Sequence, residues 1–132
     1  MAGAFALLAA GAVHLHEYHG FYSAVPTIGP LFLVNFVGAT AIGVALLAPL
    51  EHLTGRLRGA AVGLFTTGGI GLAAGSFVML LVSEHSSIFG FHEAGYDPAA
   101  ISAARASELA TVALLVTSLV IRFATRGPKA RW

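Results

Sequence analysis

The chain has 132 residues and a formal net charge of only +1 at pH 7. Hydrophobic residues make up 57% of it and charged residues 10%, whereas a soluble domain carries about 25% charged residues. A soluble domain of this size cannot bury so many apolar side chains, so the composition predicts an integral membrane protein in contact with the lipid bilayer. It excludes disordered and collagen-like chains and gives no basic surface for nucleic acid. Because cysteine is absent, disulfides, thiolate metal sites and cysteine nucleophiles are excluded as well.

Four segments are apolar enough to be membrane spans, each of which needs about 20 residues. They are residues 2–24, 31–50, 59–82 and 98–121. No Lys or Arg precedes the first apolar run, so we expect a retained helix rather than a cleaved signal peptide. Short connections between consecutive spans favour antiparallel neighbours. The sequence therefore predicts an all-α membrane protein, with residues 1–132 forming a single antiparallel four-helix transmembrane bundle.

The fourth span has a recognisable start. Asp97 precedes Pro98, and these residue types favour the N-cap and the first turn of a helix, respectively. We therefore expect this helix to begin at Pro98.

The basic residues predict the orientation of the bundle. Cytoplasmic loops of membrane proteins are rich in Lys and Arg. Six of the seven basic residues lie between the second and third spans or after the fourth: Arg56, Arg58, Arg122, Arg126, Lys129 and Arg131. With four spans, both regions share one side with the N-terminus. We expect a multi-pass protein of the inner (plasma) membrane with both termini in the cytoplasm.

Histidine and acidic residues gather on the opposite, outer side. Ten of them fall there: His14, His16, His19, His85, His92, Glu17, Glu84, Glu93, Asp97 and Glu108. The positive-inside rule does not explain this asymmetry, because acidic and neutral groups contribute little to orientation. The outer half of the bundle is therefore the candidate functional region.

Depth along the helices pairs some of these side chains. At about 1.5 Å per residue, His14 and Glu108 each lie about 15 Å below the outer ends of the first and fourth spans, and Glu17 and Arg105 about 10 Å below them. If these spans are antiparallel neighbours, His14 meets Glu108 and Glu17 meets Arg105. Asn35, about 7 Å into the second span, can join the upper layer of Glu17 and Arg105. The sequence thus predicts a polar cluster of His14, Glu17, Asn35, Arg105 and Glu108.

Two interpretations of this cluster stay open. Ionisable groups at this depth cost a few kcal/mol unless they are paired or hydrated, so they should face inward. They can form an ion-pair network that fixes the helix register. They can equally bind a ligand, a metal or a proton.

A divalent metal is the cofactor that these residues suit best, although its presence stays open. His14, Glu17 and Glu108 could bind it together with loop residues His85, His92 or Glu93. Imidazole and carboxylate ligands suit zinc, iron or copper. His16 lies about 200° around the helix from His14, so the two cannot share an ion. The di-metal pattern of helical bundles needs a second motif copy that is missing here.

Other chemistry is less well supported. Haem needs axial ligands, usually His, and the second to fourth spans contain no deep histidine. Chains of Glu and His can relay protons, but the inner half offers no matching relay. No catalytic triad, phosphate loop, nucleotide fingerprint or zincin motif is present, so an enzyme is not favoured.

The third span carries small residues at every fourth position: Gly59, Gly63, Thr67, Gly71 and Gly75. Such a ridge lets helices approach closely, and we expect it to pack within the bundle or against another subunit. The aromatic loop of residues 88–96 is expected to lie along the outer interface or to cover the polar pocket.

Several short motifs resemble a group of small, uncharacterised four-helix integral membrane proteins of high-GC bacteria. They are Ala12-Val13-His14, residues 26–35, residues 89–93 and Glu108. Size and helix count also resemble the DoxX-like proteins more loosely. The resemblance implies a four-helix membrane fold and carries no activity.

The predicted function is an accessory or scaffold subunit of a larger membrane complex, associated with other membrane subunits or with itself. The alternative is a membrane-embedded protein that binds a metal or a small ligand through the polar cluster. Small size and the glycine ridge favour the first function, and the concentration of His and Glu favours the second.

Overall fold

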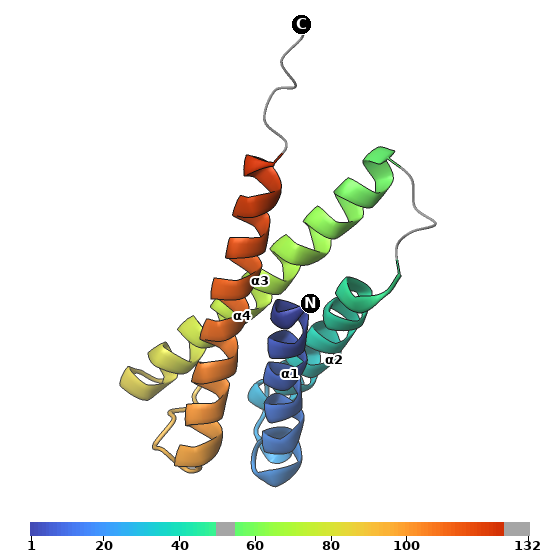
Figure 1. Ribbon diagram of the computed structural model, residues 1–132. Coiled ribbons are helices and arrows are strands. Elements are labelled where there is room, and N and C mark those ends of the chain that lie inside the picture. Colours follow the sequence, from blue (N-terminus) through green and yellow to red (C-terminus); the bar gives the residue numbers. More distant parts are fainter. Residues whose placement is uncertain (50–54, 126–132) are drawn as a thin grey trace, which may run out of the picture.

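The computed structural model describes residues 1–49 and 55–125 of the chain. Within these ranges the chain is all-helical, as predicted, with no β-strand (Figure 1). Its elements are α1 (Ala2–Gly20), the 3₁₀-helix η1 (Tyr22–Ala24), α2 (Ile28–Leu47), α3 (Gly55–His85) and α4 (Pro98–Ala124). The predicted end of the second span at Leu50, and the basic residues Arg126, Lys129 and Arg131, lie outside the described residues.

Three of the described helices, α2, α3 and α4, are long and apolar enough to cross a membrane. The 19-residue α1 is not among them. Its second half carries His14, His16, Glu17 and His19, which lower its hydropathy. The structure therefore supports a membrane protein through three helices, whereas the first predicted span, residues 2–24, and the orientation of the bundle remain predictions.

The turn between α1 and α2 is tighter than the sequence predicted. The first helix ends at Gly20, four residues early, and the chain turns into η1. Helix α2 then begins at Ile28, three residues earlier than predicted. Gly29 makes this possible, because a Cβ atom there would lie 2.5 Å from the carbonyl oxygen of Tyr22. The close backbone contact brings Tyr22 back toward the bundle.

The last two helices are longer than their predicted spans. Helix α3 extends to His85 rather than residue 82, which places Glu84 on the helix. Helix α4 begins at Pro98 as predicted, and the Asp97 side chain accepts a hydrogen bond of 2.9 Å from the backbone N–H of Ala100. The polar residues near the start of α4 are thus fixed by a capped helix end.

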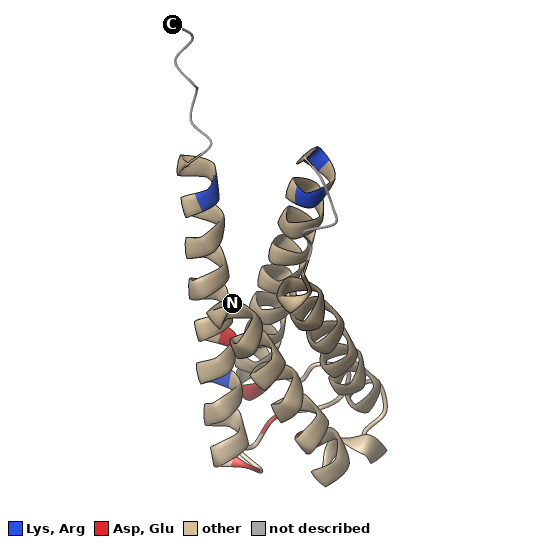
Figure 2. Cartoon of the chain, turned by 45° about the vertical axis from the view of Figure 1, so that its right-hand side comes forward, with Lys and Arg blue, Asp and Glu red and all other residues tan. Residues whose placement is uncertain are grey.

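Consecutive helices run in opposite directions and form a ring (Figure 1). Helix α1 packs against α2 and α4, and α3 packs against the same two helices from the other side. Helix α3 is inclined, so its Gly55 end leans away from the end of α4 in both views (Figures 1 and 2). All four helices meet at Gly69 of α3, which faces Leu7 of α1, Ile42 of α2 and Leu115 of α4.

The core of the ring is built from small residues. Gly11 of α1 faces Ala39 of α2, where an added Cβ would lie 2.9 Å from the alanine Cβ. Gly69 of α3 faces Leu7 and Leu115, where an added Cβ would lie 3.2 Å and 2.9 Å from their methyl carbons. Such contacts are typical of membrane helices, in which small residues let the backbones approach.

The glycines at the centre of the predicted ridge of α3 make no close helix contact with the part of the chain that the structure describes. An added Cβ at Gly63, Gly71 or Gly75 would meet nothing within 4 Å. Thr67 is exposed and Gly59 is half-buried near the open end of α3. The expected packing inside the bundle was therefore wrong for Gly63, Gly71 and Gly75. The period of four identifies a ridge, but the rotation of α3 turns Gly69 toward the core instead.

Charge is divided between the two ends of the described helices (Figure 2). Arg56 and Arg58 lie in the first turn of α3, and Arg122 lies in the last turn of α4. Figure 2 shows these basic bands at one end, with the acidic residues in the other half. Of the four arginines in the described ranges, Arg105 lies in the acidic half, where it pairs with Glu84.

Candidate functional site

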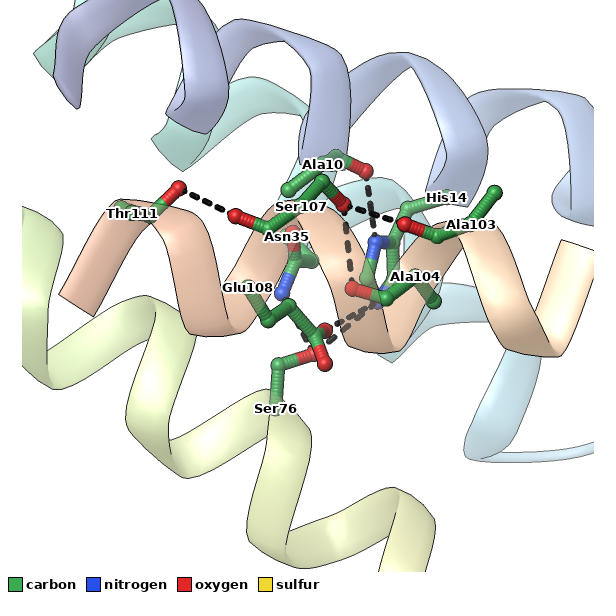
Figure 3. A network of polar contacts seen from close by, with 9 residues as sticks. All are labelled: Ala10, His14, Asn35, Ser76, Ala103, Ala104, Ser107, Glu108 and Thr111. Carbon is green, nitrogen blue, oxygen red and sulfur yellow. Dashed lines mark hydrogen bonds and ion pairs between the residues drawn. The ribbon is translucent and has the colours of Figure 1, made fainter. Parts of the chain in front are cut away.

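Each of the helices α1 to α4 contributes one polar side chain to a cluster inside the bundle. We call His14 of α1, Asn35 of α2, Ser76 of α3 and Glu108 of α4 the deep cluster (Figure 3). His14, Asn35 and Glu108 are buried, and Ser76 is half-buried. The structure brings His14 and Glu108 together, as their equal depths predicted. Asn35 joins this deeper layer through Ser76, rather than the layer of Glu17 and Arg105 in which it was predicted.

The imidazole of His14 is held by its own helix. Its Nδ1 lies 2.8 Å from the carbonyl oxygen of Ala10, one turn earlier. A carbonyl oxygen can only accept a hydrogen bond, so Nδ1 must donate. In the neutral imidazole Nε2 is then an acceptor, and it lies 2.9 Å from Oγ of Ser76. The hydroxyl of Ser76 donates to it.

Ser76 connects the histidine to the second helix. Its Oγ accepts a hydrogen bond of 2.9 Å from the side-chain amide of Asn35. The hydroxyl thus receives one hydrogen bond and gives another. Ser76 was not among the predicted residues, because a hydroxyl is unremarkable in an apolar helix. From the predicted end of the third span at residue 82 it lies about 9 Å deep, and only the extension of α3 to His85 increases this depth to about 14 Å.

Glu108 is the least satisfied member of the deep cluster. Its Oε1 lies 3.7 Å from Nε2 of His14, which is an ion-pair distance rather than a hydrogen bond. Its Oε2 is buried without a hydrogen-bond partner, and the residue is only 1% exposed. By contrast, Ser107 and Thr111 on the same helix donate to backbone carbonyls of α4 (Figure 3). Glu108 therefore has unused capacity to accept a hydrogen bond.

Arg105 does not pair with Glu17, and that prediction was wrong. Its guanidinium donates to the carboxylate of Glu84 on α3, with which it forms a salt bridge. Equal depth pointed to Glu17, but α3 continues past its predicted end and carries Glu84, which pairs with Arg105 of α4. Glu17 is left with one oxygen, Oε1, that is buried and has no hydrogen-bond partner.

A second group of polar side chains lies where α1 ends and α4 begins. We call His16, Glu17 and Asp97 the rim cluster. Each offers one ligand atom, and these three atoms lie within 4.8 Å of one another. Glu17 is 5% exposed, whereas His16 is exposed. The faces of α1 divide, with His14 and Glu17 buried and His16 and His19 exposed.

The loop between α3 and α4 covers the outer end of the bundle. Phe89 and Gly90 both have positive φ, and Ile88 and Phe91 exchange backbone hydrogen bonds of 2.7 and 2.8 Å across them. Phe91 meets the ring of Tyr22 edge-on at 5.5 Å. The loop therefore folds over the bundle rather than only lying along its surface.

Glu93 fixes this loop to η1. Its carboxylate accepts a hydrogen bond from the hydroxyl of Tyr22 and further bonds from the backbone N–H groups of Gly95 and Tyr96. Burial and the adjacent Glu93 raise the pKa of the Tyr22 hydroxyl well above its usual value. Tyr22 thus stays a hydrogen-bond donor, and Glu93 is occupied by the loop.

The predicted metal ligands do not form one centre. His14 and Glu108 belong to the deep cluster, Glu17 to the rim cluster, and Glu93 to the loop contacts, while His85 and His92 are exposed. In the described ranges, the rim cluster is the group of three or more candidate ligands with atoms within 4.8 Å. Two of its members, His16 and Asp97, were absent from the predicted set.

A cavity of about 310 Å³ runs from the loop to the deep cluster. Most of its lining is apolar, including Ile28, Phe32, Leu72 and Ile101. All four deep-cluster residues also line it: His14, Asn35, Ser76 and Glu108. Ligand pockets are typically about 300–1,000 Å³ with a few convergent polar groups, so this cavity has the size and lining of a site for a small ligand.

The cavity reaches the outside of the bundle between α2 and α3. Leu31 and Val34 of α2 and Gly71, Gly75 and Met79 of α3 line it and are also exposed. The two glycines present no side chain there. A ligand entering by this route would come from the membrane side of the helices.

Comparison with protein-family models, curated proteins and solved structures found no match for this chain. The resemblance to small four-helix membrane proteins therefore stays an expectation from the sequence. The function of the site has to be argued from its geometry.

Proposed function

We propose that this chain is a membrane-embedded protein that binds a small amphipathic molecule with a hydrogen-bond-donating, preferably cationic, head group. The carrying observation is the buried Oε2 of Glu108, which has no hydrogen-bond partner and belongs to a residue that lines an otherwise apolar cavity. The head group would lie at Glu108 and His14, and the apolar body along the cavity.

The hydrogen bonds that the structure shows within the deep cluster are not directed to Oε2 of Glu108. The hydroxyl of Ser76 is directed to Nε2 of His14, and the amide of Asn35 to Ser76. Neither group donates a hydrogen bond to Oε2 of Glu108. Leaving a buried acceptor unpaired costs about 1–3 kcal/mol, and more for a charged group. A ligand that brings a donor removes this cost, and a carboxylate ligand would add to it.

The cationic preference follows from the charges around the cavity. Glu17, Glu93 and Glu108 line it, and no Lys or Arg does so among the described residues. A buried carboxylate is stable when it is paired with a cation and hydrogen-bonded. An ammonium group supplies both the charge and several donors.

Entry from the membrane fits the setting of the cavity. Three helices are apolar enough to span the bilayer, and basic residues lie at the far end of α3 and α4. We therefore place the cavity in the outer half of a four-span bundle in the inner (plasma) membrane, with both termini in the cytoplasm. The amphipathic ligand would reach it through the opening beside Gly71 and Gly75.

The accessory-subunit function stays a prediction. The exposed apolar faces of α2, α3 and α4 fit lipid as well as a partner subunit, so they do not distinguish the two functions. The deep cluster and its cavity are the features that favour ligand binding.

A matched set of eight-carbon probes tests the proposal. The full chain in lipid nanodiscs is titrated with n-octylamine, 1-octanol and octanoate, and its thermal unfolding midpoint is followed, because a ligand that binds the folded state stabilises it. We expect octylamine to stabilise most and octanoate least. Glu108→Gln should remove this order. Glu84→Gln, an acidic residue outside the cavity, should keep it.

Equal stabilisation by octanoate and octylamine would contradict the proposal. The same conclusion would follow if Glu108→Gln kept the full preference for the amine.

A further inference from the structure

We propose that the rim cluster, His16, Glu17 and Asp97, binds a divalent transition-metal ion such as Zn²⁺ where the end of α1 meets the start of α4. This site shares Glu17 with the lining of the cavity but differs from the proposed ligand site in its other residues. His16 and Asp97 do not line the cavity, and the deep-cluster residues do not belong to the rim cluster.

The three side chains already converge. Nε2 of His16 lies 4.0 Å from Oε1 of Glu17, and the three candidate ligand atoms lie within 4.8 Å of one another. Zinc binds His nitrogen and carboxylate oxygen at about 2.0–2.2 Å, so tetrahedral ligands lie about 3.3 Å apart. The rim cluster must therefore contract by about 1 Å around an ion. His16 can follow because its side chain is 76% exposed.

The environment of Glu17 is an independent indication of a cation-binding site. Its side chain is 7% exposed, and its Oε1 has no hydrogen-bond partner. Arg105, the cation expected to neutralise it, forms its salt bridge with Glu84 instead. Among the described residues, the basic group within ion-pair distance of Glu17 is His16, at the 4.0 Å limit. A buried carboxylate in this position is stabilised by a metal ion.

Asp97 can bind a metal without giving up its structural contact. Its Oδ1 accepts the hydrogen bond from Ala100 that caps α4, and its second oxygen is available as a ligand. That oxygen and the carboxylate of Glu17 supply two negative charges, which neutralise a divalent ion. One imidazole with two carboxylates is a ligand set suited to zinc and its first-row neighbours. The exposed side of His16 leaves the fourth position to water.

The expected consequence is a metal link between α1 and α4 beside the cavity. The three ligands come from two helix ends that are far apart in sequence, so the ion would hold the rim together. The link needs no change in the deep cluster.

Zinc binding is measured on the purified full chain in lipid nanodiscs, by competition with a chromophoric zinc chelator. We expect one Zn²⁺ per chain, with affinity at least tenfold lower in His16→Ala and in Asp97→Asn. Asn keeps a side-chain oxygen for the helix cap but removes the ligand charge. His19→Ala is the matched control, because His19 is also exposed on the last turns of α1 and should leave the affinity unchanged.

Absence of stoichiometric zinc binding would overturn the proposal, as would equal losses in His16→Ala and His19→Ala. Two cross-tests separate this failure from failure of the ligand proposal. Glu108→Gln should retain zinc binding, and His16→Ala should retain the preference for octylamine over octanoate.

Discussion

The deep cluster and the rim cluster lie on the same helices but meet their polar requirements differently. In the deep cluster, the neutral side chain of Asn35 donates to Ser76, and Ser76 donates to His14. In the rim cluster, two carboxylates stand beside one exposed histidine, and no Lys or Arg of the described residues forms a salt bridge with either carboxylate. Hydroxyl and amide groups can be buried at small cost once they are bonded, whereas carboxylates need a cation. The difference points to a donor-bearing ligand in the deep cluster and a metal ion at the rim.

Ser76→Ala should have the largest effect on the deep cluster. It removes the hydroxyl that links His14 and Asn35 and leaves both without that partner. Interhelical hydrogen bonds in membranes contribute about 0.6 kcal/mol on average and up to about 1.7 kcal/mol, so we expect a loss of about 2 kcal/mol in the free energy of unfolding for two such bonds. The loss is measured by SDS titration of the protein in mixed micelles.

Ser102→Ala is the matched control for this change. Ser102 lies on the exposed side of α4 and donates to the carbonyl of Pro98 in its own helix, so its loss should have no measurable effect. If both alanine variants unfold alike, the deep cluster does not hold the helices together.

The deep cluster could be predicted only in part. Helix rise is constant, so counting from the helix ends placed His14 and Glu108 at one level. Rotation and helix length are not fixed by that count. Helix α3 continues to His85, which supplied Glu84 as the partner of Arg105 and left Glu17 for the rim. The contact predicted at Gly71 is absent because residue spacing does not determine which face of α3 meets its neighbours.

Gly71→Leu separates access to the deep cluster from its stability. An added Cβ would meet no atom within 4 Å, so the free energy of unfolding should change by less than about 0.5 kcal/mol, as for an exposed position. The larger side chain should obstruct the opening between α2 and α3. We expect a several-fold slower binding of octylamine in stopped-flow measurements. A loss of stability as large as that of Ser76→Ala would instead show that the glycine ridge is a packing surface.

Asp97→Ala tests how much the helix cap at Asp97 contributes to the stability of the fold. The variant removes the side-chain oxygen that accepts from Ala100 at the start of α4, and loss of such an N-cap costs typically about 1 kcal/mol. Asp97→Asn should retain most of this stability while it loses zinc affinity. The free energy of unfolding of both variants, measured without metal, checks the first part. Equal destabilisation by Ala and Asn would mean that the charge, rather than the cap, stabilises the helix end.

Arg105→Gln should have a small effect on stability, and it distinguishes the two partners considered for this arginine. In the structure Arg105 pairs with Glu84, and their side chains are 40% and 20% exposed. Solvent screens such a pair, so its removal should cost less than about 1 kcal/mol. Glu84→Gln should cost a similar amount, and the double variant should cost little more than either alone. Had Arg105 neutralised the buried Glu17, its removal would leave an unpaired buried charge, at a cost of about 3–5 kcal/mol. If Arg105→Gln lowered the free energy of unfolding by that amount, and adding Glu17→Gln restored it, Arg105 would be the partner of Glu17. A metal ion would then not be needed to neutralise Glu17.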